Sequence, residues 1–79
     1  MTAKEMFKVI GFVPFFETKD LIIYENFPDN KKERIDVIFY LKNKKIRAYY
    51  VENDKDVFID MTLLKVINQQ CKELGWLDE

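Results

Sequence analysis

The chain has 79 residues, with 13 Lys and Arg against 14 Asp and Glu, one Cys, and neither His nor Ser. Since domains usually hold about 100 to 200 residues, residues 1–79 are expected to form a single compact domain. The hydrophobic content of 48% favours a folded protein over a disordered tail. Without Ser or His, the Ser-His-Asp and Cys-His catalytic systems cannot be built, so we expect no enzyme, no cofactor and no metal site.

The N-terminal segment predicts a helix. Thr2 followed by Glu5 three residues later is a capping box, in which each side chain accepts a hydrogen bond from the other residue's backbone. Gly11 is placed to end the helix and to let Phe12 pack back on Phe7. The apolar face of the helix consists of Ala3, Met6, Phe7 and Ile10.

Three strands are expected in the middle of the chain, at residues 21–27, 34–41 and 45–52. The apolar run at 13–16 contains Pro14, so it predicts an extended connection or an edge strand. A two-residue turn at Asn43 and Lys44 would pair the second and third strands. This register places Leu41 opposite Ile46, Phe39 opposite Ala48 and Val37 opposite Tyr50.

The C-terminal third predicts a short closing strand and a second helix. Val57, Phe58 and Ile59 follow a polar turn and are expected to form an edge strand. Asp60 or Thr62 can cap the helix that follows. Its apolar face is expected to hold Leu63, Leu64, Ile67, Cys71 and Leu74. Gly75 is expected to end the helix so that Trp76 folds back on Cys71.

The predicted fold class is α+β, a two-layer domain with the order helix, three- or four-stranded antiparallel sheet, helix. Both helices are most simply placed on the sheet face that carries Val37, Phe39, Leu41 and Ile46. The run 6–16 is interrupted by Lys8 and Pro14 and is shorter than the roughly 18 residues that a membrane span needs. We therefore expect a cytoplasmic protein with no membrane partner.

Two stretches, residues 3–12 (AKEMFKVIGF) and 67–77 (INQQCKELGWL), are similar to the ends of a known group of proteins. They resemble small uncharacterised proteins encoded in prophages and other mobile elements of Gram-positive bacteria. Those proteins begin with a stretch like KEMFEELGY and end with IxxQxxELGW around a variable, strand-rich middle. The resemblance implies a mobile-element context in a bacterial cytoplasm, and it implies no activity.

The second face of the predicted sheet is the first candidate for a binding surface. If Val37 and Phe39 point toward the helices, an apolar patch with a polar rim is left on the other side. Tyr and Arg are favoured residues at protein interfaces. The patch would consist of Ile38, Tyr40, Tyr49 and Val51, flanked by Arg47 and Asp36. The alternative is that Phe15 and Phe16 fold over this face and cover it.

A basic hairpin is the second candidate. Residues 31–47 hold seven cations and two acids, and Lys42, Lys44, Lys45 and Arg47 surround the predicted turn. Cations beside Tyr40 and Tyr49 could contact phosphates and stack on bases. The alternative is that these lysines keep a strand edge from pairing. The net charge of −1 argues against nucleic acid as the main partner.

Two further groups are best explained by structure rather than chemistry. The acidic residues Glu52, Asp54, Asp56 and Asp60 lack the glycine and glutamate that a calcium loop requires, so they predict a solvated turn and a helix cap. Cys71 is expected to pack in the core. The sequence therefore favours a small non-enzymatic interaction protein that binds itself, as a homodimer, or a host or phage protein. A nucleic-acid-binding accessory protein is the alternative.

Overall fold

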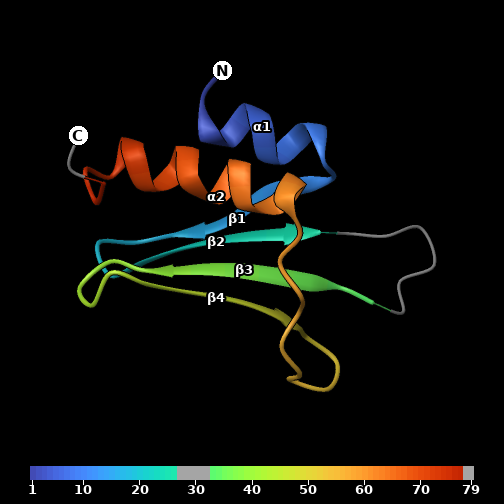
Figure 1. Cartoon of the computed structure of the whole chain (residues 1–79). Coiled ribbons are helices and arrows are strands. Elements are labelled where there is room, and N and C mark those ends of the chain that lie inside the picture. The colour runs from blue at the N-terminus through green and yellow to red at the C-terminus, as the bar shows by residue number, and fades with distance from the viewer. Residues whose placement is uncertain (27–32, 78–79) are drawn as a thin grey trace.

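A computed structural model describes residues 1–26 and 33–77 of the chain, and it has the predicted order of elements. The elements are α1 (Ala3–Val9), β1 (Phe12–Glu17), β2 (Leu21–Asn26), β3 (Ile35–Tyr40), β4 (Lys45–Tyr50) and α2 (Met61–Glu73). The four strands form one antiparallel sheet in the order β1-β2-β3-β4. Both helices lie on the same side of this sheet and leave its other side uncovered (Figure 1). The predicted two-layer α+β fold is confirmed.

Both helices begin and end where the sequence predicts. The Thr2 backbone donates to Glu5 Oε1 over 2.8 Å, and the Glu5 backbone donates to Thr2 Oγ1 over 3.2 Å. The bond from the Thr2 backbone, and a second one that the Thr2 hydroxyl donates to the same carboxylate, lower the pKa of Glu5, because they favour its charged form. The N-cap of α2 is Asp60. At its end, Gly75 has a φ of +75°, and the Trp76 N–H donates to the carbonyl of Cys71 over 2.9 Å.

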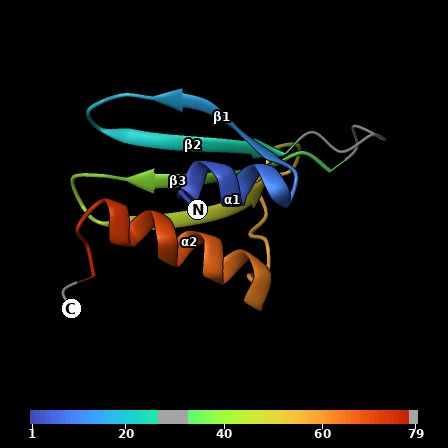
Figure 2. The ribbon, with the colours of Figure 1, turned by 90° about the horizontal axis from the view of Figure 1, so that it is seen from above.

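The apolar run after α1 is the edge strand β1, one of the two predicted possibilities (Figure 2). The register between β1 and β2 shifts by one residue between Pro14 and Phe16, so Phe15 lies in a bulge. Backbone groups alternate in direction along a strand. The backbone groups of Val13 face its partner Glu25, so the nitrogen of the next residue, Pro14, faces the free edge. A proline there costs no ladder hydrogen bond, which explains why β1 tolerates it.

The predicted register of the β3–β4 hairpin is wrong by two residues. Val37 pairs with Ala48 and Phe39 pairs with Ile46, and residues 41–44 form a four-residue turn in which Lys44 has a φ of +54°. A shift of two residues keeps every side chain on its predicted face, because side chains alternate with a period of two. The strands also end earlier than expected, at Tyr40 and Tyr50. Phe27, predicted as the end of the preceding strand, lies outside the described residues.

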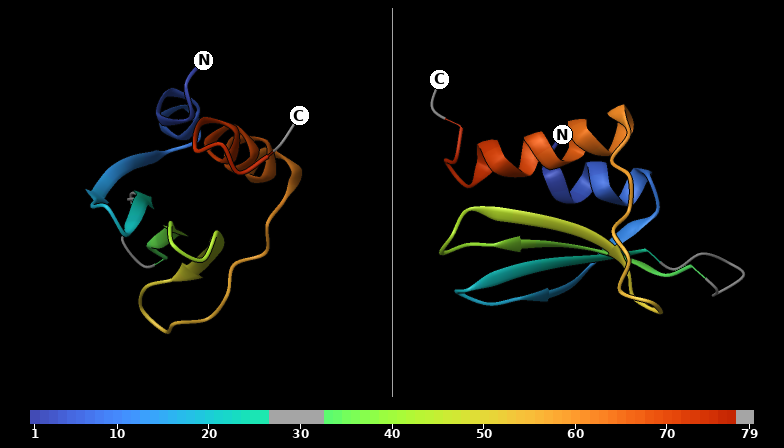
Figure 3. Two further views of the ribbon diagram at one scale, coloured as in Figure 1. Left: turned by 90° about the vertical axis from the view of Figure 1, so that its left-hand side faces the viewer. Right: turned by 60° about the horizontal axis from the view of Figure 1, so that its bottom comes forward.

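The predicted closing strand at residues 57–59 does not form. Only Asp56 makes a strand-type bridge, to Tyr49, and the Val57 N–H donates to the carbonyl of Ala48 over 2.9 Å. The chain then leaves the sheet edge because it must cross from the sheet layer to the start of α2 in the helix layer (Figure 3). We call residues 55–60 the connector.

The core lies between the helices and the inner sheet face, the face that the helices cover. Phe7 of α1 stacks on Tyr24 of β2 with ring centroids 3.9 Å apart, and Phe39 of β3 packs edge-on against both rings. The Tyr24 hydroxyl donates to Gln70 Oε1 of α2 over 2.6 Å. Burial, with the Glu73 and Glu17 charges, raises the pKa of Tyr24 to about 12. The hydroxyl therefore stays protonated and joins the sheet to α2.

Candidate interaction surface

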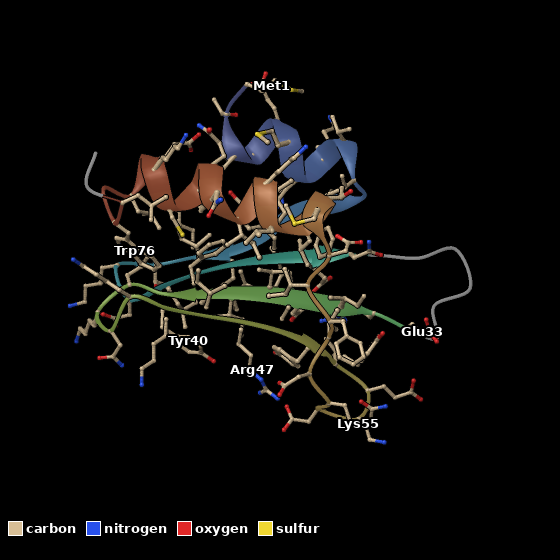
Figure 4. The ribbon with its side chains drawn as sticks, viewed as in Figure 1. Met1, Glu33, Tyr40, Arg47, Lys55 and Trp76 are labelled. Carbon is tan, nitrogen blue, oxygen red and sulfur yellow. The ribbon has the colours of Figure 1, made fainter. Side chains whose placement is uncertain are left out.

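The side chains that point away from the helices form a surface that we call the outer sheet face. Figure 4 shows two of them, Tyr40 and Arg47, extending from the side of the sheet opposite to the helices. Cross-strand partners share a face, so the registers assign the rest of this surface, except Phe15 in the bulge, which the contact of its ring with Arg34 places here. It consists of Val13, Phe15 and Phe16 on β1, Leu21, Ile23 and Glu25 on β2, Asp36, Ile38 and Tyr40 on β3, and Lys45, Arg47 and Tyr49 on β4.

The apolar part of the outer sheet face is concentrated on the edge strand β1. Phe15 is 54% exposed and Phe16 is 52% exposed, with ring centroids 6.5 Å apart. Phe16 lies opposite Ile23, and Ile23 lies opposite Ile38, so an apolar row crosses three strands. The expectation that Phe15 and Phe16 could fold over this face is wrong. They extend the face sideways because the run that contains them pairs with β2 as a strand.

The structure places four of the five predicted interface residues together on this face. Ile38 is buried even without a helix above it, while Tyr40, Tyr49 and Arg47 are half-buried. The Arg47 guanidinium lies 4.5 Å from the centre of the Tyr49 ring. Val51 lies beyond the end of β4, where its N–H donates to the carbonyl of Arg34 over 2.9 Å. The outer sheet face therefore has its polar part on β3 and β4.

A buried ionic cluster, which sequence reasoning missed, lies next to the aromatic pair. Glu25 is 0% exposed and Asp36 is 5% exposed, and they are direct cross-strand partners. Arg34 contacts Glu25 Oε2 at 2.7 Å and Asp36 Oδ1 at 3.8 Å. The same guanidinium lies 5.7 Å from the centre of the Phe15 ring. Two buried carboxylates thus share one arginine, which sits beside the exposed aromatic side chains.

Burial controls the protonation of this cluster. Loss of solvent raises the pKa of Glu25; the Arg34 charge lowers it and the Asp36 charge raises it further. Burial likewise raises the pKa of Asp36, against the Arg34 charge and a hydrogen bond from the Tyr49 side chain, which both lower it. No alternation in the sequence could have found the cluster, because residues 21–24 are apolar or aromatic at every position and only the β2–β3 register pairs Glu25 with Asp36.

The predicted nucleic-acid contacts are not a free basic patch. Arg47 Nη1 contacts Asp54 Oδ1 at 3.1 Å, and Arg47 Nε donates to Asp56 Oδ1 over 3.1 Å. These two acids and the hydrogen bond to Asp56 raise the pKa of Arg47. Lys42 is 3.5 Å from Asp20, and Lys44 and Lys45 are exposed at the turn. Two of the four predicted cations thus have acidic neighbours, which weakens their attraction for phosphate.

The remaining candidate groups have structural surroundings. Cys71 is buried, and burial raises the pKa of its thiol, which disfavours the reactive thiolate. Within residues 1–26 and 33–77, no three His, Cys, Asp or Glu side chains converge to hold a metal ion. Neither of the helices described is long and apolar enough to cross a membrane. The acidic turn is explained by Arg47, which binds two of its carboxylates.

Comparison with known proteins adds nothing to this geometry: no protein-family model, no curated protein and no solved structure matches the chain.

Proposed function

We propose that this chain is a small non-enzymatic protein-interaction module that pairs with a second copy of itself through the outer sheet face. The observation that carries the proposal is the exposure of Phe15 and Phe16, side by side on the one sheet face that no helix covers. Each half-exposed Phe leaves about 100 Å² of ring surface in water. Aromatic side chains are enriched at protein interfaces, and two of them exposed together are typical of a contact site.

The size of the face supports a weak, symmetric contact. Six-residue strands span about 20 Å, and four strands about 4.8 Å apart cover a similar width, so the face is about 400 Å² in projection. Stable interfaces bury about 800 Å² of accessible surface on each partner. The outer sheet face is therefore smaller than a standard interface, and we expect a dimer with a dissociation constant in the micromolar range or weaker.

The cellular setting follows from the resemblance of residues 3–12 and 67–77 to mobile-element proteins of Gram-positive bacteria. It supports a role in a bacterial cytoplasm, and a host or phage protein is the alternative partner of the outer sheet face. The nucleic-acid alternative finds less support, because Arg47 is held by Asp54 and Asp56.

Sedimentation velocity over a hundred-fold range of concentration tests the proposal. We expect the sedimentation coefficient to rise with concentration, and Phe16→Asp to abolish the rise because it places a charge in the contact. The matched control is Phe58→Asp, which makes the same change at a 99% exposed Phe of the connector. A protein that stays monomeric at the highest concentration, or one in which Phe58→Asp has the same effect as Phe16→Asp, would contradict the proposal.

A further inference from the structure

The free edge of β4 is only half covered. The Val57 N–H donates to the carbonyl of Ala48, and the Tyr50 N–H donates to the carbonyl of Lys55 over 2.8 Å. Since backbone groups alternate in direction, the N–H and C=O of Ile46, two residues before Ala48, also face this edge. In the part of the chain that the structure describes, no backbone group outside the sheet ladder bonds to Ile46.

A hollow of about 500 Å³ lies beside this uncovered half of β4. It forms where the connector leaves the edge after Val57 on its way to α2. Ile46, Ala48, Val57 and Ile59 supply its apolar lining, and Tyr40, Lys45, Arg47 and Asp56 supply its polar lining. The site thus combines unpaired strand backbone with a partly apolar recess, which are the two elements of peptide recognition by strand addition.

We propose that this edge binds an extended peptide segment of another protein, which adds to β4 as a short antiparallel strand. The connector already pairs with the other half of β4 in the antiparallel direction, which shows that the edge accepts a strand. The bound segment bonds to the N–H and C=O of Ile46 and places an apolar side chain between Ile46 and Ile59. Because the connector covers the edge from Ala48 onward, only three or four residues of the segment can pair.

The positive charge at the start of β4 favours a bound segment with an acidic residue. Antiparallel addition brings its C-terminal side to the start of β4, where Lys44 and Lys45 are exposed. An acidic residue after the apolar one is therefore favoured. A second copy of this edge fits poorly, since pairing two copies about Ile46 would place Lys45 of one opposite Arg47 of the other. This contact differs from the outer sheet face in both its residues and its partner.

A labelled hexapeptide of alternating Thr and Val that ends in two Glu is the probe, titrated against the Phe16→Asp variant to remove self-association. We expect saturable binding that slows hydrogen exchange of the Ile46 amide. A peptide ending in two Lys, and one N-methylated at its central Val, should each bind at least about ten-fold more weakly, because they lose the charge match or a backbone hydrogen bond.

Two charge reversals locate the peptide along the edge. Lys45→Glu, beside the hollow, is expected to weaken binding by roughly three- to ten-fold, and Lys55→Glu, at the covered end of the same edge, by less than about two-fold. Equal binding of the N-methylated peptide, equal effects of the two reversals, or slowed exchange elsewhere than at β4 would each overturn the inference. None of these outcomes bears on dimer formation, which sedimentation measures separately.

Discussion

The two faces of this sheet come from the same four strands, yet they are buried by different means. On the inner face, Tyr24 and Phe39 are covered by α1 and α2 and make ring contacts with Phe7. On the outer face, Glu25 and Asp36 are equally buried, but by neighbouring side chains of the sheet and by Arg34. Burial alone therefore does not tell the core from the candidate contact surface. What distinguishes the candidate contact surface from the core is the exposed aromatic pair Phe15 and Phe16.

The largest difference between the faces is expected for a buried charge. Phe39→Asp should abolish the cooperative thermal transition, because an unpaired carboxylate between the helices and the sheet, with the loss of a core ring, costs more than about 4 kcal/mol. Phe16→Asp makes the same change on the outer face and should leave a folded protein. Circular dichroism melts compare the two variants. If Phe16→Asp also unfolds the chain, the outer face belongs to the core.

A smaller difference is expected for the tyrosines. Tyr24→Phe removes the 2.6 Å hydrogen bond to the buried Gln70 and should lower the free energy of unfolding by about 1 to 3 kcal/mol. Tyr40→Phe, on the half-buried outer side, should change it by less than about 0.5 kcal/mol. Urea denaturation measures both values. Equal losses would mean that the Tyr24 bond does not join the sheet to α2.

The ionic cluster of the outer face predicts a pH dependence. Burial raises the pKa of both Glu25 and Asp36 in the folded state, so the folded protein holds more protons than the unfolded chain between the ordinary and the raised values. The free energy of unfolding should therefore fall as the pH rises through that window, and it should recover on acidification toward the ordinary carboxyl values.

Glu25→Gln is expected to flatten this pH profile, because Arg34 then faces one buried carboxylate instead of two. The exposed Glu52→Gln should leave the profile unchanged. Urea denaturation at several pH values compares the three proteins. A wild-type profile that rises with pH over the same window would show that Arg34 outweighs burial at this cluster.

The smallest effect is expected at the turn between β3 and β4. Lys44 is exposed and has a φ of +54°, a region that Asp tolerates better than most residues. Lys44→Asp should therefore change the free energy of unfolding by less than about 0.5 kcal/mol. A larger loss, measured by urea denaturation, would mean that the Lys44 side chain has a structural role at the outer face.

The sequence predicts the parts of the fold that local chemistry decides. The Thr2–Glu5 capping box, the Asp60 cap and the glycine at position 75 each act within a few residues, so their pattern is sufficient. The alternation of residues 34–41 likewise assigns Val37 and Phe39 to the inner face. It cannot fix the hairpin register, because shifts by two residues keep the same faces.

The parts that the sequence could not predict depend on long-range geometry. Residues 57–59 have the composition of a strand, but they must leave the sheet to reach α2. Phe15 and Phe16 are apolar enough to fold over the sheet face, but the run that contains them pairs with β2 as a strand. The burial of Glu25 could not be predicted from its own position in the sequence, since it depends on Asp36 and Arg34 of the neighbouring segment. The sequence therefore predicted which side chains point away from the helices, but it did not predict that Phe15 and Phe16 supply the exposed apolar part of that face.

The central claim is that the outer sheet face, and not the helix layer, is where two copies meet. Backbone amide shifts recorded by NMR from about ten micromolar to one millimolar protein test it most directly. We expect concentration-dependent shifts at Phe15, Phe16, Ile23 and Tyr40, with constant shifts along α1 and α2. Shifts that do not depend on concentration, or that cluster on the helices, would contradict the account.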